Sequence, residues 1–326
     1  MFSHIYIEEE IENYPLTTEI LQNFPKAIKV PIQNYKNVFN PYNQSFQAQK
    51  NKKKLILAKK RDNFIYSGSP LTDTFHRGKF YYNSLMMNCL YNCEYCYLQG
   101  MYNSSHIVVF VNLDDFFGET IKLLEIEEKV TLCISYDTDL LAMERYIPYT
   151  SKWIDFASKI PELTIEIRTK SNSYKDISNL KPSKNIILAW TLSPEEIVKN
   201  IESDTPTLNR RIQSIREATR DGWRTRICID PVLHIKNWKT LYKSLIHKIF
   251  EYPELNEIEE ITFGVFRINS EYLKKMKKMR VDSKLLYYPY KKFGKIETYS
   301  SEVESKMKQF IFEEIRCFLP KEKIFY

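Results

Sequence analysis

From about residue 79 onward, the hydrophobic positions of the chain follow two alternating periodicities. Short runs rich in β-branched and aromatic residues predict strands, and segments with an apolar residue every three or four positions predict helices. The predicted strands are 79–87, 130–135, 163–168, 185–191, 223–230 and 260–266, and the predicted helices are 112–127, 149–160, 207–222 and 239–250. Thr207 and either Asn269 or Ser270 are the expected helix N-caps, and Asp221-Gly222 is an expected helix end.

Strands that alternate with helices indicate right-handed βαβ units and a parallel sheet. About six such units predict an α/β fold, namely a partial (β/α)6 barrel of the TIM type rather than a closed eight-stranded one. Residues 1–78 show no regular pattern and are expected to form an irregular α/β N-terminal region. We therefore divide the chain into an N-terminal region packing on the barrel (1–78), the barrel (79–268), and a C-terminal region with a closing helix (269–326).

Composition narrows the class of protein. The chain has 326 residues, of which 43% are hydrophobic and 27% charged, with a formal net charge of +7. No apolar run approaches the roughly 20 residues that span a bilayer. The first residues lack the basic and apolar regions of a secretory signal. We therefore expect a cytoplasmic protein without membrane contact.

Half of the six cysteines lie within eight residues, at Cys89, Cys93 and Cys96. The spacing C-x3-C-x2-C favours metal binding over disulfides in a reducing compartment. Three thiolates can hold three irons of a [4Fe–4S] cluster and leave the fourth iron open to the amino and carboxylate groups of S-adenosylmethionine (SAM). The alternatives are a structural zinc site, which normally closes four ligands, and three unrelated buried cysteines.

C-x3-C-x2-C is the signature of the radical SAM superfamily, and the string CEYCYLQ at 93–99 resembles the version found in spore photoproduct lyase. The resemblance is spread over nearly the whole chain. Further similar positions are Tyr6-Ile7-Glu8, Tyr14-Pro15-Leu16, Val111-Asn112, Ser135, Asp139, Thr169-Lys170, Thr205-Pro206, Leu208, Arg211-Ile212, Pro231 and Lys323-Ile324.

The resemblance implies an enzyme that uses a 5′-deoxyadenosyl radical to split the 5-thyminyl-5,6-dihydrothymine lesion of DNA back to two thymines. It implies cluster ligation by the three cysteines. The positions it assigns to SAM binding are Ser135, Thr138, Lys170 and Thr191. Tyr95 and Tyr97 match a pair that returns a hydrogen atom to the adenosyl group, although two tyrosines in a chain with 23 can equally be packing residues. Lys170 can also be read as a surface lysine at a strand end.

The sequence departs from the family at one position. The family has a radical-quenching cysteine in a Ser-Cys-Thr-Ser-Asp string, and the corresponding string here is SYDTD at 135–139. This places Tyr136 at the donor position, and a phenol can also donate a hydrogen atom. Asp137 and Asp139 either orient this loop or cap the following helix, and we favour the cap.

A basic and aromatic segment lies near the C-terminus. Between Lys274 and Lys295, nine Lys or Arg stand against one Asp, and aromatic residues are interleaved. Cations for phosphates and flat rings for stacking suit a DNA-contacting surface, and the YYPY run at 287–290 suits a hairpin that occupies the gap left by an extruded lesion. The alternative is a solvated helix face. The residues expected to contact DNA or the lesion are Arg267, Tyr287, Tyr288, Tyr290, Lys291 and Lys292, and the Lys50–Arg61 stretch is either a second phosphate-contacting region or a flexible arm.

Three functions remain open at this point. The leading hypothesis is a radical SAM lyase of the spore photoproduct lyase type, whose partners are lesion-containing DNA and an electron donor such as a flavodoxin or ferredoxin. The second is a radical SAM enzyme of the same family with another substrate, which the missing donor cysteine favours. The third is a non-catalytic metal-containing nucleic-acid-binding protein.

Overall fold

The computed structural model of the chain describes residues 2–68 and 79–326 and shows a mixed α/β fold. The chain divides into two compact units. The first unit holds Met1–Leu90 and Met101–Glu166, and the second holds Tyr91–Gly100 and Ile167–Tyr326. The boundary predicted at residue 78 falls at the end of segment 69–78, outside the described residues. The division at residues 78 and 268 stays a prediction.

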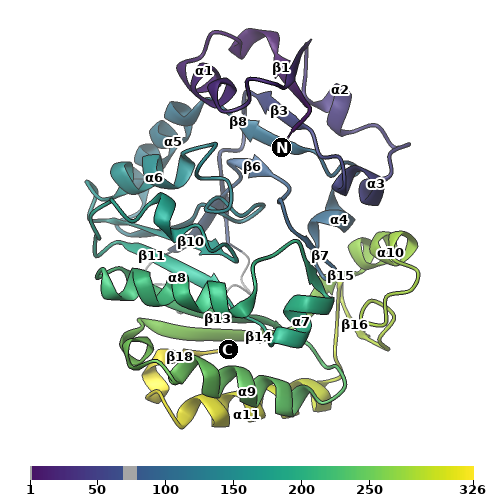
Figure 1. Cartoon of the computed structure of the whole chain (residues 1–326), viewed down its shortest axis with the longest axis vertical. Helices are drawn as coiled ribbons and strands as arrows, with labels where there is room; N and C mark the ends of the chain where they lie inside the picture. Colours follow the sequence, from purple (N-terminus) through teal and green to yellow (C-terminus); the bar gives the residue numbers. More distant parts are fainter. Residues whose placement is uncertain (1, 69–78) are drawn as a thin grey trace. The chain divides into compact units, whose positions relative to one another are not determined.

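The first unit contains a sheet with the strand order β2-β1-β3-β8-β6. Strands β1, β2, β3 and β8 are parallel, and β6 pairs antiparallel with β8. Figure 1 shows β1, β3 and β8 next to one another. The bounds are β1 His4–Glu8, β2 Ile28–Ile32, β3 Leu55–Ala58, β6 Met86–Met87 and β8 Ile107–Phe110, with helices α1 Pro15–Gln22, α2 Lys36–Phe39, α3 Phe46–Lys50 and η1 Glu9–Ile11.

The expectation of an irregular N-terminal region is therefore wrong. Strands β1, β2 and β3 have only four or five residues each, which is too short for a periodicity to stand out in the sequence. Strand β3 is buried at every position, so it reads as an apolar run and not as an alternation. The lysine-rich stretch from Lys50 to Arg61 contains this strand at its centre, and Lys50 is the last residue of α3.

The same unit also holds the strands that begin the parallel series. Their order is β10-β9-β5-β4, with β5, β9 and β10 parallel and β4 antiparallel to β5. The predicted strand 79–87 is interrupted after Asn83, because Met86 and Met87 pair with β8 instead. The bounds are β4 Ile65–Ser67, β5 Lys79–Asn83, β9 Val130–Cys133 and β10 Leu163–Thr169, with helices α5 Leu113–Ile126 and α6 Tyr149–Ala157.

The second unit continues from the end of β10 with the strand order β10-β11-β13-β14-β18. The pairs β11–β13, β13–β14 and β14–β18 are parallel. The predicted strands and helices of this part are confirmed within a few residues, and Figure 1 shows α9 and α11 side by side below β14 and β18. The bounds are β11 Ile186–Thr191, β13 Arg224–Val232, β14 Glu260–Val265 and β18 Ile324–Phe325, with α7 Glu195–Asn200, α8 Leu208–Arg220, α9 Trp238–Phe250, α11 Ser301–Arg316, η2 Tyr174–Asp176, η3 Pro253–Glu257 and η4 Lys321–Lys323.

Smaller elements of the second unit flank these strands. They are the pair β7 Asn92–Cys93 and β12 Glu202–Ser203, the short helix α4 Leu98–Met101 that begins in this unit, helix α10 Ser270–Met279, and the antiparallel strands β15 Arg267–Asn269, β16 Lys291–Phe293 and β17 Ile296–Thr298.

The predicted helix ends are confirmed. Thr207 is the N-cap residue of α8, and Asp221 is its C-cap, followed by Gly222 in the left-handed region at φ +89°. Asn269, rather than Ser270, caps α10 by accepting a hydrogen bond from the Glu271 N–H. Within residues 2–68 and 79–326, no helix is both long and apolar enough to cross a membrane.

Candidate cluster and cofactor site

The cysteine loop of the second unit, residues 91–100, is fixed by its backbone. Cys93 lies in β7 and pairs antiparallel with Glu202 of β12. The Cys96 N–H donates to the Cys93 carbonyl at 3.1 Å, which closes a tight turn between the two thiols. The side-chain amide of Gln99 donates to the carbonyls of Cys93 (3.3 Å) and Glu94 (2.8 Å). The two thiols are therefore presented by a loop that is held along its length.

Cys89 belongs to the first unit and is fixed there by separate contacts. The Lys50 ammonium, which is buried, donates to the Cys89 carbonyl at 2.9 Å. The preceding residue, Asn88, has a left-handed backbone at φ +69° and donates from its side-chain amide to the carbonyls of Ser104 and His106, both at 2.8 Å. An asparagine tolerates this conformation better than most residues.

The donor set fits an iron–sulfur cluster. None of the six cysteines forms a disulfide, and Cys89 and Cys96 keep part of their surface accessible. In the described part of the chain, no group of three or more His, Cys, Asp or Glu side chains is placed to hold a single metal ion. Three thiols on a C-x3-C-x2-C spacing are the ligands that a cluster requires.

A buried carboxylate that the sequence analysis missed lies behind this loop. Glu202 is fully buried, and its carboxylate accepts hydrogen bonds from the hydroxyls of Tyr95 and of Ser193 (2.8 Å) and forms an ion pair with Arg211 at 2.6 Å. Burial raises the pKa of Glu202, but Arg211 and Lys170 outweigh it, so that the pKa lies below the ordinary value. Burial, together with the charge of Glu202, raises the pKa of the Tyr95 phenol well above its ordinary value.

Tyr95 is thus a neutral hydrogen-bond donor to a carboxylate, and only 8% of its surface is exposed. Arg211 was noted in the sequence only as a similar position. Glu202 lies in a stretch without hydrophobic periodicity, so the sequence pattern does not single it out. The available signal is that an acidic residue stands in the segment that precedes Arg211.

The two expected SAM-binding residues of the second unit stand at strand ends. Thr191 ends β11 and is buried, and its carbonyl accepts from Arg211 at 3.2 Å. Lys170 follows β10, and its ammonium lies 5.6 Å from the centre of the Tyr95 ring. Lys170 is therefore partly enclosed beside the cysteine loop and is not a freely solvated lysine. Tyr97 stands at the start of α4 and is half-buried.

The loop after β9 holds the expected residues of the first unit. Ser135 is buried, and the Thr138 hydroxyl oxygen is buried with no hydrogen-bond partner among the described residues. A buried hydroxyl without a partner costs free energy unless a ligand satisfies it, so Thr138 fits the predicted cofactor contact. Asp139 accepts from the Ala142 N–H at 3.1 Å and caps a turn, not a helix as we expected, and Asp137 accepts from the Tyr102 hydroxyl.

Tyr136 differs from its neighbours in this loop because 39% of its surface is exposed. Its ring stacks on Tyr82 of β5 with centroids 4.1 Å apart and planes at 24°. Tyr82 in turn stacks on Tyr66 of β4 at 5.1 Å. The stack on Tyr82 holds the ring of Tyr136, and part of the residue stays accessible.

The expected DNA-contacting residues separate into two groups. Lys291 and Lys292 are exposed on β16, which forms a hairpin with β17 through a turn that contains Gly294 at φ +60°. Arg267 is exposed on β15, next to the same hairpin. Tyr287 is 52% exposed and has the Lys277 ammonium 5.5 Å from its ring centre.

The expectation that the YYPY run forms the hairpin is wrong. Tyr287 ends a turn, the residues from Tyr288 to Tyr290 are in no helix or strand, and the hairpin begins at Lys291. Tyr288 and Tyr290 both pack on the buried Tyr299, with ring centroids 4.9 and 5.3 Å away. Burial, together with Tyr299, raises the pKa of the Tyr290 phenol. The exposed aromatic residue of the hairpin is Phe293 instead, which is 51% exposed.

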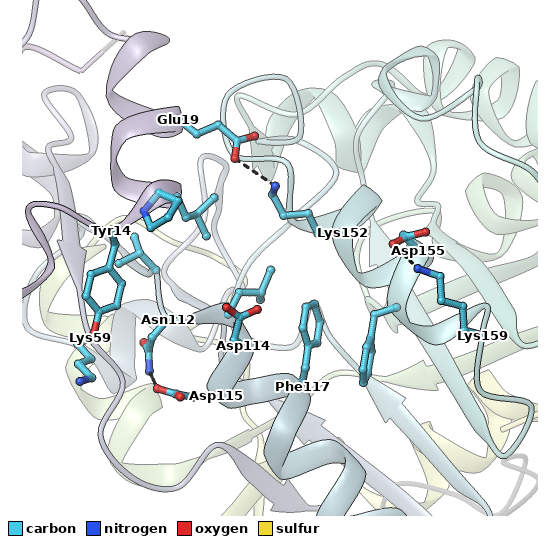
Figure 2. A pocket seen from close by; sticks show the side chains of 15 residues that line it. Tyr14, Glu19, Lys59, Asn112, Asp114, Asp115, Phe117, Lys152, Asp155 and Lys159 are labelled. Atoms are coloured by element: carbon cyan, nitrogen blue, oxygen red, sulfur yellow. Dashed lines mark hydrogen bonds and ion pairs between the residues drawn. The ribbon is translucent and has the colours of Figure 1, made fainter.

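A cavity of about 540 Å³ in the first unit is lined by none of these residues. Figure 2 shows its walls, which include Tyr14, Lys59 and Asp114. Its charged groups largely neutralise one another, as in the ion pair of Glu19 with Lys152 at 3.1 Å. We therefore do not place the active site there.

Comparison with known proteins identifies relatives along the whole chain. A family model described as spore photoproduct lyase matches residues 1–326. The spore photoproduct lyase of Clostridium acetobutylicum is 24% identical over 100% of this chain and 98% of its own length, and that of Bacillus subtilis is 20% identical over 99% and 97%. Solved structures of a spore photoproduct lyase variant with a dinucleoside spore photoproduct, and of another with AdoMet as well, match at a TM-score of 0.85 and 18% identity, covering 100% of this chain and 98% of theirs.

Proposed function

The chain belongs to the spore photoproduct lyase family, and we propose that it returns 5-thyminyl-5,6-dihydrothymine in DNA to two thymines with Tyr136 as the hydrogen-atom donor. It is a radical SAM enzyme whose cofactors are a [4Fe–4S] cluster and SAM. The third of our initial hypotheses, a non-catalytic nucleic-acid-binding protein, is overturned by membership in a family of enzymes.

The residues of the chain take separate roles toward these groups. Cys89, Cys93 and Cys96 are the cluster ligands in this proposal. When bound, the cluster and SAM together supply the 5′-deoxyadenosyl radical that starts the reaction. Lys170 suits the SAM carboxylate, because its ammonium is held beside the cysteine loop by the Tyr95 ring.

Hydroxyl groups supply the remaining contacts to the amino-acid part of SAM in this proposal. They come from Ser135, Thr138 and Thr191. The buried, unpartnered oxygen of Thr138 is the observation that supports a bound ligand most directly.

Tyr136 carries the proposal for the quenching step. Its phenolic O–H bond breaks, a C–H bond forms on the thymine-centred radical, and a phenoxyl radical stays on Tyr136. Tyr136 is 39% exposed, which leaves part of the residue accessible to a substrate, and stacking on Tyr82 holds the ring in place. In this proposal the phenol of Tyr136 replaces the thiol of the family's cysteine as the hydrogen-atom donor. The phenol is the bulkier of the two groups.

The test uses the reconstituted protein, a dinucleoside spore photoproduct and three variants. Tyr136→Phe keeps the stacked ring and removes only the O–H bond. We expect it to cleave SAM and consume the lesion but to lose most of the thymine yield. Tyr136→Cys restores a hydrogen-atom donor and is expected to recover the yield, and Tyr82→Phe serves as the matched control within the stack. An unchanged yield of thymine in Tyr136→Phe would exclude Tyr136 as the donor.

A second candidate function is radical SAM chemistry of the same family on another substrate. The replacement of the family's donor cysteine by Tyr136 is the observation that favours it. Wild-type protein that cleaves SAM but leaves the lesion intact would support this candidate over lesion repair.

We propose the hairpin β16–β17 as the main DNA-contacting element. Lys291 and Lys292 supply exposed cations for phosphates, and Arg267 and Tyr287 flank them. Tyr288 and Tyr290 support the region from inside and do not stack on bases. The exposed Phe293 at the turn is the aromatic residue best placed to meet one.

Several expectations stay proposals. The parallel strands of both units are compatible with a partial (β/α)6 barrel, which we propose as the closer description of the mixed α/β fold. We also propose the three-part division at residues 78 and 268. A flavodoxin or ferredoxin as electron donor and a location in the cytoplasm remain predictions from the sequence.

A further inference from the structure

The basic segment near the C-terminus contains one cation that points away from solvent. Arg280 directly follows helix α10, and its guanidinium reaches the cysteine loop. Nε donates to the Gln99 side-chain oxygen at 2.7 Å, and Nη2 donates to the Asn92 side-chain oxygen at 2.6 Å and to the Asn92 carbonyl at 3.4 Å. Asn92 immediately precedes Cys93, so the contact lies next to a cluster ligand.

Two further contacts fasten the same helix region to the same loop. The Ser283 hydroxyl donates to the Glu94 carboxylate. Gly100 packs against helix α10 so closely that a Cβ at this position would lie 2.5 Å from the Cβ of Tyr272. Figure 1 shows α10 beside β7, in keeping with these contacts. The loop and the start and end of α10 therefore form one packed body inside the second unit.

The charge of Arg280 lies beside the cysteine loop, because its guanidinium is bound to Gln99 and Asn92. Burial lowers the pKa of the Arg280 guanidinium, while Glu94 and the sulfurs of Cys96 and Cys93 oppose that shift. An arginine at this position stays protonated at any working pH. Asn92 precedes Cys93, and Gln99 donates to the Cys93 carbonyl, so a permanent cation held by side-chain hydrogen bonds lies next to the backbone of a cluster ligand.

We propose that Arg280 is a positioning residue that holds the cysteine loop and raises the reduction potential of the cluster bound by Cys93 and Cys96. Reduction adds one negative charge to the cluster, and a nearby fixed cation stabilises the more negative state. The side chains that orient metal ligands act in the same way in other metal sites. The inference rests on the cluster and is independent of which lesion or substrate the enzyme accepts.

The competing role is a phosphate contact, which the position of Arg280 in the basic segment suggests. The geometry argues against it, because both the Nε and an Nη of the guanidinium are engaged by Gln99 and Asn92. Lys278, two positions earlier, is exposed and has no such engagement with the loop in the hydrogen bonds described. Lys278 therefore provides a matched control from the same helix.

The experiment compares anaerobically reconstituted wild type with Arg280→Met, Arg280→Lys and Lys278→Met. Iron content and thermal unfolding establish that each variant is folded and loaded. The reduced cluster is followed by EPR in a redox titration without SAM, and binding to duplex DNA is measured as a function of salt concentration.

We expect Arg280→Met to lower the equilibrium constant for cluster reduction about tenfold, a shift of about 59 mV for a one-electron couple. Arg280→Lys keeps the charge and is expected to lie nearer to wild type. Lys278→Met is expected to leave the potential unchanged and to reduce the salt dependence of DNA binding instead.

Three results would overturn the inference. The first is a wild-type potential in fully loaded Arg280→Met. The second is an Arg280→Lys variant whose reduction potential shifts as far as that of Arg280→Met, which would show that the positive charge is not the cause. The third is a reduced salt dependence of DNA binding in Arg280→Met with no change in potential, which would assign the residue to phosphate. The redox titration needs neither SAM nor the lesion. A wild type that does not repair the lesion would therefore contradict the proposed function without affecting this inference.

Discussion

At the residue scale, the cysteine loop is supported by a buried ion pair between Glu202 and Arg211. Glu202 combines a backbone pairing with Cys93, a hydrogen bond from Tyr95 and an ion pair with Arg211. A buried ion pair of this kind gives little net stability by itself, but removing one partner leaves an uncompensated buried charge. The contacts of Glu202 therefore tie the shape of the loop to the charge balance behind it.

We expect Glu202→Gln to lower the free energy of unfolding by about 3 kcal/mol, because Arg211 is left buried without its counter-charge. Tyr95→Phe removes only one hydrogen bond to the carboxylate and is expected to cost about 1–2 kcal/mol. Urea unfolding at neutral pH measures both. A double variant whose effect equals the sum of the two would show that the two residues do not interact and would contradict the network.

A histidine of the first unit provides a pH-dependent test. His106 is 8% exposed and accepts the Lys54 N–H at Nδ1 over 3.2 Å; burial, helped by Lys54, lowers the pKa of His106 to about 4. In the unfolded chain the same ring binds a proton near pH 6.5, so stability falls as the pH drops from 6.5 to 4 and changes no further below that.

We expect the free energy of unfolding to fall by about 2 kcal/mol more between pH 7 and pH 5 in the wild type than in His106→Gln, which does not titrate. Urea unfolding midpoints at the two pH values measure this difference. Equal pH dependence in the two proteins would contradict a lowered pKa, because it requires the ring to have the same pKa in the folded and unfolded states.

The sequence alone suggested candidates for the residues that take part directly in the chemistry, and their roles stay proposals. The cysteine spacing indicated a cluster without any structural information, and Tyr136 was located by comparison with a short string. Glu202 and Arg280 were not recognised, because each acts through a partner that is distant in sequence. Arg280 is 188 residues from Asn92, and Glu202 is 107 residues from Tyr95. No local pattern encodes such contacts.

At the scale of elements, the close approach of α10 to the cysteine loop depends on the absence of a side chain at Gly100. The space that a Cβ would occupy is filled by backbone and Cβ atoms of Tyr272, which cannot move independently of the helix. Gly118, in the middle of α5, has no atom within 4 Å of the same position and gives a matched comparison.

We expect Gly100→Ala to destabilise the protein by about 1–3 kcal/mol, since the helix must shift to accommodate the methyl group. Gly118→Ala should instead stabilise it by about 0.5–1 kcal/mol, because alanine loses less conformational entropy within a helix. Thermal unfolding of the two variants measures the change in stability, and their iron content shows whether the cluster is still bound. Equal effects of the two substitutions would show that α10 does not press on the loop.

Elements with a strong periodicity were predicted well, and short ones were not. Helices α5, α8 and α9 and the strands β9, β11 and β13 lie within a few residues of their expected bounds. The hairpin was placed at the YYPY run, whereas the turn forms around Gly294, where a left-handed backbone is available. Aromatic residues next to a turn can pack inward, as Tyr288 and Tyr290 do on Tyr299, and the sequence alone does not show which way they face.

At the scale of the whole molecule, charge sets how the protein meets a polyanion. The formal net charge of +7 is modest for 326 residues, so its distribution determines the affinity for DNA. The lysines of the hairpin are exposed, whereas Lys50 and Arg280 are occupied by the cysteines and their neighbours.

We expect the double substitution of Lys291 and Lys292 by alanine to reduce the slope of log K against log salt concentration by about 2, about one for each phosphate that is no longer neutralised. Lys159→Ala is the control, since this lysine is paired with Asp155 at 2.8 Å in the cavity wall of the first unit. Fluorescence anisotropy with duplex DNA at several salt concentrations measures the slope. A slope unchanged by the double substitution would remove the hairpin from the DNA surface.

For the molecule as a whole, the order of strands and helices was predictable from the alternating periodicities, and the family was predictable from the cysteine motif at 89–96 and the similar positions along the chain. The sheet formed by β1, β2, β3, β8 and β6 was not, since β8 and β6 join it from beyond the boundary drawn at residue 78. Pairing between strands that are far apart in sequence depends on tertiary packing and leaves no mark on either strand alone.

The pairing of Glu202 with Arg211 also constrains how this protein can be engineered. A library that randomises either position by itself, selected for folded protein, should return almost only the starting residue. Every single replacement leaves the remaining charge buried without a counter-charge. A library that randomises both at once should return apolar pairs of similar volume, which replace buried ion pairs without loss in other proteins. Such pairs would also free the Tyr95 hydroxyl, so selected clones would report whether turnover tolerates a phenol with no carboxylate to hold it.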